Sequence, residues 1–185
     1  MGYEAFAGQT EALRLVLDRT GRSPVLWITT IMKTMKPYQK FGVMIATSTL
    51  VMFGLMYLNT YAADHIIFSQ TRAWMAVLMG AVMAVVMLAF MSGMYPNRRA
   101  NVAILAGSAV VCAIALWLVR SQATVDDVSY MKAMIPHHSI AIMTSKRAHI
   151  SDPRVRKLAD EIIEAQVREI AEMKALIADL ERKDR

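Results

Sequence analysis

Three long stretches of the sequence consist of apolar and small uncharged residues, without a single charged side chain. They are residues 41–59, 73–95 and 101–119. Each is close to the roughly 20 residues that a helix needs to cross a bilayer. The first stretch begins only at Phe41 and two more follow it, which argues against a cleaved signal peptide. The pattern predicts an all-α protein whose region 41–119 crosses the membrane three times.

The positions of lysine and arginine predict how these spans are oriented. The basic residues before the first span and between the second and third are Lys33, Lys36, Lys40, Arg98 and Arg99. Cationic flanks stay in the cytoplasm. We therefore expect a bacterial inner-membrane protein with a cytoplasmic N-terminal segment, residues 1–40, and a periplasmic C-terminal domain, residues 120–185.

The polar and apolar residues of this C-terminal domain predict a helical hairpin. Thr124 and Asp127 resemble a capping box, so we expect a first helix to start there and to continue to about Ala148. Pro136 should bend or restart that helix, because proline removes one backbone N–H.

A second helix is expected after residue 151. Asp152 is a suitable N-cap and Pro153 suits the first helical position, which together make a strong start signal. The helix should end near Leu180. Its expected apolar face comprises Val155, Leu158, Ile162, Ala165, Met173, Leu176 and Leu180.

Methionine and histidine residues gather on this hairpin. Met131, Met134 and His138 have i, i+3, i+7 spacing and should share a face, whereas His137 is turned away by about 100°. In a hairpin that is symmetric about residue 151, His138 lies opposite Ala165, Met134 opposite Glu169, and Met131 near Met173.

The residues expected across the hairpin complete a candidate metal site. Gln166, Glu169 and Met173 share a face of the second helix, and a glutamate in an apolar stripe is costly without a partner such as an imidazole N–H. Thioether and imidazole groups suit Cu(I) better than Mg²⁺, Ca²⁺ or Mn²⁺. Glu169 or Gln166 would fix a histidine tautomer. The predicted ligands are Met131, Met134, His137, His138 and Met173. The alternative is that these methionines fill the core and the histidines only bond Glu169.

Other methionines and one further histidine raise related possibilities. Met75, Met79, Met83, Met87 and Met91 follow one another at four-residue intervals. Each such step drifts about 40° around a helix, so five of them wind across nearly half its circumference. This favours packing over a continuous copper path. His65 could form a second soft site with Met56 and Met75.

Several functional classes find no support in the sequence. Acidic and basic residues nearly balance within 120–185, and no basic stripe suits nucleic acid. Cys112, the single cysteine, lies inside the third predicted span, so it forms no disulfide framework. The Glu-x-x-His pairs of di-iron bundles and the usual hydrolase motifs are absent from the sequence, so we do not expect an enzyme.

Residues 126–180 resemble a known family. The residues that carry the likeness are Met131-x-x-Met134-Ile135-x-His137-His138, Ala141, Met143, Asp152, Lys157-Leu158-Ala159, Ile163, Gln166, Glu169-Ile170 and Met173. In this order they are similar to the family catalogued as domain of unknown function 305. The resemblance implies an exported, ferritin-like helical bundle, with some relatives associated with copper binding or copper tolerance. Fuller members have two hairpins where this chain has one, which favours a site shared between chains, or a weaker one.

The sequence thus predicts a membrane-anchored periplasmic protein that binds copper, as Cu(I), for buffering or handover. A hairpin of about 60 residues buries little core on its own. We therefore expect a homodimer or higher oligomer, with a copper-handling protein as a possible partner. The alternative function is a metal-free oligomerisation module in which the polar residues specify helix register.

Overall fold

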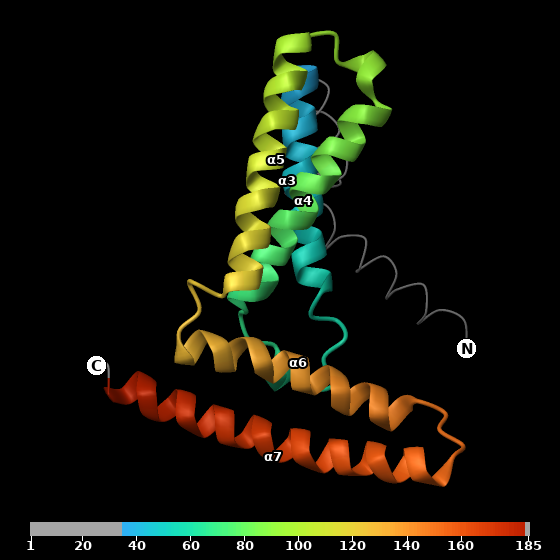
Figure 1. Cartoon of the computed structure of the whole chain (residues 1–185), viewed down its shortest axis with the longest axis vertical. Helices are drawn as coiled ribbons and strands as arrows, with labels where there is room; N and C mark the ends of the chain where they lie inside the picture. Colours follow the sequence, from blue (N-terminus) through green and yellow to red (C-terminus); the bar gives the residue numbers. More distant parts are fainter. Residues whose placement is uncertain (1–34, 184–185) are drawn as a thin grey trace, which may run out of the picture. The chain divides into compact units, whose positions relative to one another are not determined.

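The computed structural model describes residues 35–183, which form helices and turns without any strand. The α-helices are α3 (Pro37–Leu55), α4 (Gln70–Phe90), α5 (Arg98–Ser121), α6 (Asp127–Arg147) and α7 (Pro153–Lys183), as Figure 1 shows. Two short 3-10 helices are η1 (Ala63–His65) and η2 (Ser92–Met94). The all-α prediction is confirmed for this part of the chain. Of the predicted cytoplasmic segment 1–40, residues 1–34 lie outside the described residues.

The chain divides into two compact units, Met1–Met44 and Ile45–Arg185, and every contact described below lies within the second. Within that unit α4 packs along α5, and α6 packs along α7 (Figure 1).

Two of the three predicted spans meet the length and apolarity that a bilayer requires. They are α4 and α5, and they suggest a membrane protein. α3 is shorter and opens with the polar residues Tyr38, Gln39 and Lys40. The helices begin three or four residues before the predicted spans, and two of them end earlier than predicted. The first helix ends at Leu55, four residues early, and α4 ends at Phe90, because the chain turns into η2 around Gly93.

Small residues let the apolar helices approach one another closely. Ala76, Gly80, Ala81 and Ala84 are the buried small residues of α4. A Cβ atom on Gly80 would collide with the side chain of Thr49 on α3, so a larger residue at position 80 would force that side chain to shift. Large apolar side chains such as Leu50, Phe90 and Trp117 remain exposed, as expected for surfaces in contact with lipid.

Helix starts follow from local hydrogen bonds. The side chain of Asp126 accepts a hydrogen bond from the backbone N–H of Ser129, 2.7 Å away, and caps α6. The predicted cap at Thr124 is therefore wrong, because the aspartate lies directly beside the first turn and accepts more strongly. Asp152 accepts the N–H of Arg154, and α7 begins at Pro153 as predicted.

The α6–α7 pair has a core of isoleucines. Ile135 and Ile142 of α6 and Ile170 of α7 are almost fully buried, and Ile67 from the loop before α4 packs against them. The predicted apolar face of α7 is partly wrong. Ile163, Ile170 and Ile177 contribute to the core with Met173, whereas Val155, Leu158 and Leu176 are half exposed. The loop residue Ile67 packs against this core and adds apolar surface that a hairpin alone would lack.

Candidate metal centre

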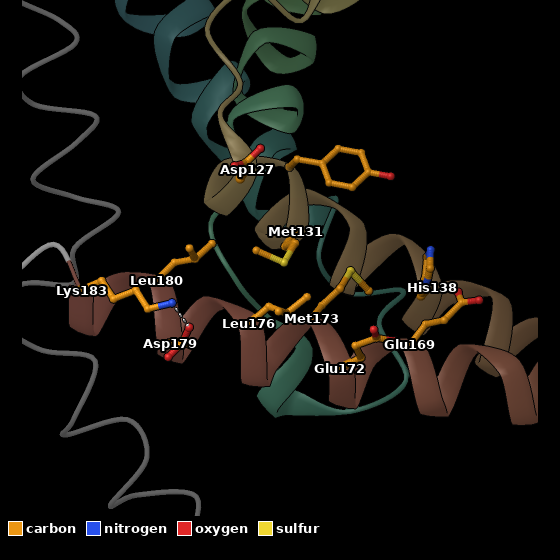
Figure 2. A pocket seen from close by; sticks show the side chains of 11 residues that line it. Asp127, Met131, His138, Glu169, Glu172, Met173, Leu176, Asp179, Leu180 and Lys183 are labelled. Carbon is orange, nitrogen blue, oxygen red and sulfur yellow. Dashed lines mark ion pairs between the residues drawn. The ribbon is translucent and has the colours of Figure 1, made fainter.

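A groove of about 630 Å³ runs between α6 and α7 and brings together part of the predicted ligand set. Its lining residues are Asp127, Tyr130, Met131, His138, Glu169, Glu172, Met173, Leu176, Asp179, Leu180 and Lys183. Figure 2 shows Met131 from α6 and Met173 from α7 extending into the space between the two helices. Further along the pair, His138 and Glu169 meet (Figure 2). Two thioethers, one imidazole and a supporting carboxylate thus share one groove.

The imidazole of His138 is held close to the carboxylate of Glu169. His138 Nδ1 lies 3.2 Å from Glu169 Oε2, which is close enough for an ion pair when the imidazole is protonated. The atoms are not aligned for a hydrogen bond, and among the described residues Nδ1 has no other partner. A carboxylate beside Nδ1 favours a proton on that nitrogen, which leaves Nε2 as the atom available to a metal.

Burial keeps His138 in the form that can bind a metal. Burial lowers the pKa of His138 below its usual value, Glu169 partly offsets this by raising it, and His137 lowers it further. The imidazole is therefore neutral at neutral pH, with a nitrogen lone pair free for a soft cation. Among residues 35–183, no three side chains of the His, Cys, Asp and Glu types gather as they would around a metal ion. A metal in this groove would therefore depend on methionine sulfur.

The remaining predicted residues lie elsewhere. Met134 and His137 line a different cavity of about 420 Å³, which also involves Arg72 and Gln122. Met131, Met134 and His138 were expected to share a face, but Met134 lines a different cavity from the other two. Gln166 is half-buried on α7 and lines neither of these two cavities.

The register of the pair differs from the symmetric prediction by one helical turn. Glu169 lies against His138, where Ala165 was predicted, and not against Met134. Side chains on a helix lean toward its N-terminus, which is far from the turn for α6 and next to the turn for α7. A residue of α6 therefore meets a residue of α7 that is further from the turn than a symmetric pairing assumes.

Sequence reasoning missed the role of the loop between α3 and α4. Ser139 of α6 is fully buried and accepts a hydrogen bond from the backbone N–H of Tyr61 at 2.7 Å. His65 Nδ1 lies 2.9 Å from the same hydroxyl. Lys174 of α7 forms an ion pair with Asp64 at 2.6 Å. The loop therefore contacts both helices of the pair.

These contacts also change the interpretation of His65 and Ser139. The bond to Ser139 engages His65, which was considered for a second soft site with Met56 and Met75. A small polar residue at the centre of the buried face of α6 was the available signal, because a buried hydroxyl needs partners.

Fold and groove together define an all-helical protein with two potential membrane spans and a C-terminal helix pair that carries methionine and histidine in one groove. Residues 118–185 match the model of the family described as Domain of unknown function (DUF305), so this segment of the chain is similar to that family. The resemblance predicted from the sequence is confirmed.

A curated relative shares the same segment. An uncharacterized protein of Acanthamoeba polyphaga mimivirus is 44% identical over 66 residues, which are 35% of this chain and 43% of that protein. The chain therefore spans less than half the length of that relative. No solved structure matches the chain.

Proposed function

We propose that the protein is membrane-anchored and holds copper, as Cu(I), in the groove between α6 and α7. One observation carries the proposal: Met131, His138 and Met173 line the same groove, with the carboxylate of Glu169 against His138. Two neutral thioethers and a neutral imidazole form a soft to borderline donor set, which prefers Cu(I) to the oxygen-binding cations. The carboxylate would orient the histidine ring and make its free nitrogen a better donor.

In this function copper is a cargo and undergoes no reaction on the protein. Glu169 and Leu176, which line the groove, are half-exposed in the single chain, so a bound ion there stays accessible to a second ligand. Ligand exchange with a copper-handling protein then needs no large rearrangement of the helices. This accessibility favours buffering and handover, and we propose no catalytic activity.

The membrane arrangement extends the proposal to the cell. We propose that α3 is a third span beside α4 and α5, with the N-terminus in the cytoplasm of a bacterial inner membrane. Arg98 and Arg99 in the first turn of α5, next to the α4–α5 connection, support this orientation, because cationic flanks stay inside. The α6–α7 pair then lies in the periplasm, where it can intercept copper ions.

Pairing of two copies would complete the helical domain. Val155, Leu158 and Leu176 leave a half-exposed apolar stripe along α7. Covering that stripe with the same stripe of a second copy would make a four-helix arrangement with two grooves. We propose a homodimer or higher oligomer on this basis.

The test uses the full chain purified in detergent micelles, titrated anaerobically with Cu(I) against a chromophoric chelator. The variant Met131→Leu/Met173→Leu and the variant His138→Ala each remove donors from the groove, and we expect each to weaken Cu(I) binding at least tenfold. The matched control Met134→Leu/His137→Ala removes the same residue types from the other cavity and should retain the parent affinity. Equal losses in control and groove variants would show that the groove does not hold the metal.

The competing function is a metal-free oligomerisation module. His138–Glu169 and Lys132–Glu181 (2.6 Å) both cross the helix pair, which is the observation that favours register specification. In that case the parent would fail to compete for Cu(I), and His138→Ala would change the oligomeric state measured by light scattering. Copper binding by the parent with an unchanged oligomer in His138→Ala would exclude this alternative.

A further inference from the structure

A second groove lies among the apolar helices, and four of its seven lining side chains are methionines. It has a volume of about 450 Å³ and is lined by Met52, Leu78, Met79, Val82, Met83, Val86 and Met87. Met52 comes from α3 and the other residues from α4, and all four methionines are half-buried. No charged or hydroxyl-bearing side chain contributes to the lining of this groove.

The helical geometry explains why only part of the methionine ladder meets here. Successive methionines on α4 are four residues apart and therefore drift about 40° per step. Met79, Met83 and Met87 consequently span only about 80° and face one side of α4. Met75 and Met91, at the ends of the ladder, are rotated beyond this sector and do not line the groove. Met52 approaches the same sector from α3.

Thioether sulfur in apolar surroundings selects a narrow class of ligand. Methionine is a soft, polarizable donor without charge, which suits Cu(I) and the similar Ag(I) and disfavours hard cations. The lining offers no oxygen ligand to Ca²⁺ or Mg²⁺, and water competes poorly within an apolar wall. Moving a cation into such apolar surroundings costs free energy, so binding would require several sulfur atoms at once. Met52 and two successive methionines of α4, which lie one helical turn apart, could supply several sulfur atoms to one ion.

We propose that Met52, Met79, Met83 and Met87 form a second soft-metal site, for Cu(I), within the apolar helices. The identity of the metal rests on the proposed function, but the site shares no residue with the α6–α7 groove. This site would hold copper between α3 and α4, separately from the groove between α6 and α7. Methionine as a simple packing residue is the competing explanation, and the experiment below separates the two.

The experiment counts Cu(I) per chain in the full protein in detergent micelles, under anaerobic conditions with a chromophoric chelator. The background variant Met131→Leu/His138→Ala/Met173→Leu removes the outer donors. Adding Met52→Leu/Met79→Leu/Met83→Leu/Met87→Leu to this background should remove one further Cu(I) per chain. Leucine preserves volume, so the helices should still pack. The matched control, Met75→Leu/Met91→Leu in the same background, should lose none.

Each outcome bears on one site only. If the background variant binds as much copper as the parent but the groove variant loses one ion, the outer site fails and the methionine groove stands. If the groove variant retains all the copper of its background, the inference is overturned, and an equal loss in the Met75→Leu/Met91→Leu control overturns it too.

Folding and coordination are checked separately. Should the four-residue variant fail to elute as a single species, Met79→Leu/Met83→Leu replaces it, with the same expected loss. X-ray absorption at the copper edge in the outer-site background should show sulfur neighbours alone. A nitrogen or oxygen shell there would contradict the methionine site.

Discussion

Glu169 is placed so that one carboxylate can control one imidazole. Burial lowers the pKa of His138, and the nearby Glu169 raises it, so the two effects oppose each other. The carboxylate lies 3.2 Å from Nδ1, on the side of the ring that a metal bound to Nε2 would leave free. Its proposed role is therefore to orient the ring and to increase its basicity, without contacting the metal.

Replacing this carboxylate gives a residue-scale prediction. Glu169→Gln should weaken Cu(I) binding by about 10- to 100-fold, the usual cost of losing a group that orients a metal-binding histidine. It should also lower the pKa of His138 further, because the opposing charge is gone. A chelator competition measures the first effect and NMR titration of the histidine measures the second. Glu172→Gln removes the same charge from the same groove and is the control; equal weakening by both would indicate a general charge effect.

Single residues also show how far the sequence could predict the site. The cost of a glutamate in an apolar stripe correctly pointed to a histidine partner for Glu169, since this argument needs only composition and spacing. The sequence could not supply the correct register, because that depends on the lean of side chains toward their helix N-termini. The contacts of Ser139 with Tyr61 and His65 join residues more than 70 positions apart, and local pattern contains no information about such pairs.

At the scale of helices, the close crossing of α3 and α4 depends on Gly80, which has no side chain. The hydroxyl of Thr49 donates a hydrogen bond to the carbonyl of Ile45 at 2.8 Å, which fixes the side chain that faces Gly80. A Cβ atom at position 80 would meet that hydroxyl first, and the rest of the threonine side chain at 3.3 Å. A methyl group at position 80 would therefore require the Thr49 side chain to shift.

Gly80→Ala should consequently destabilise the helices by about 1–3 kcal/mol, the usual cost of overpacking. Thermal unfolding in detergent, followed by circular dichroism, should show a lower midpoint. Gly107→Ala is the matched control, because nothing lies within 4 Å of a Cβ atom there. The double variant Gly80→Ala/Thr49→Ala should recover part of the loss. An unchanged midpoint in Gly80→Ala would contradict the close crossing.

Helix existence was predictable in this chain, whereas the face that a helix buries was not. Uncharged apolar runs and the Asp152–Pro153 start signal depend on local chemistry, so they predicted α4, α5 and α7 well. The buried face of α7 depends on Ile67, a loop residue nearly 100 positions before Ile163. An amphipathic pattern gives the width of an apolar stripe, but a distant neighbour decides which part of it is buried.

For the molecule as a whole, the α3–α4 loop is attached to the α6–α7 pair through a titratable group. Burial lowers the pKa of His65 below its usual 6.5, nearby Asp64 raises it, and Lys174 lowers it. With a neutral ring, the Ser139 hydroxyl can donate to Nδ1 while it accepts the Tyr61 N–H. Protonation of His65 puts an N–H at Nδ1, so that two donors, this one and the Tyr61 N–H, point at the Ser139 hydroxyl. It also puts a positive charge on a partly buried ring.

The pH dependence follows from this shift. Between the lowered pKa and 6.5 the unfolded chain binds more protons at His65 than the folded chain does. The stability that this residue contributes is therefore complete above pH 6.5 and declines as the pH falls through the lowered pKa. Thermal midpoints of the parent should fall between pH 7.5 and 5 more steeply than those of His65→Asn. His149→Asn, at an exposed position, should keep the parent slope, and identical slopes in all three proteins would contradict the coupling.

The proposed pairing of two chains makes the last prediction, which depends on the stripe that α7 leaves uncovered. Leu158 and Leu176 are 55% and 47% exposed and lie on one side of α7, five helical turns apart by the helix repeat. Leu158→Gln/Leu176→Gln should remove apolar surface from the stripe without opening a cavity, since neither side chain is buried. Light scattering in detergent should then show a shift from oligomer to monomer with unchanged helix content. Val167→Gln offers a control, because Val167 is equally exposed (53%) but lies on a different side of α7. If the parent chain stays monomeric at every concentration, the pairing is overturned. If the leucine variant keeps the oligomer, the interface lies on another surface.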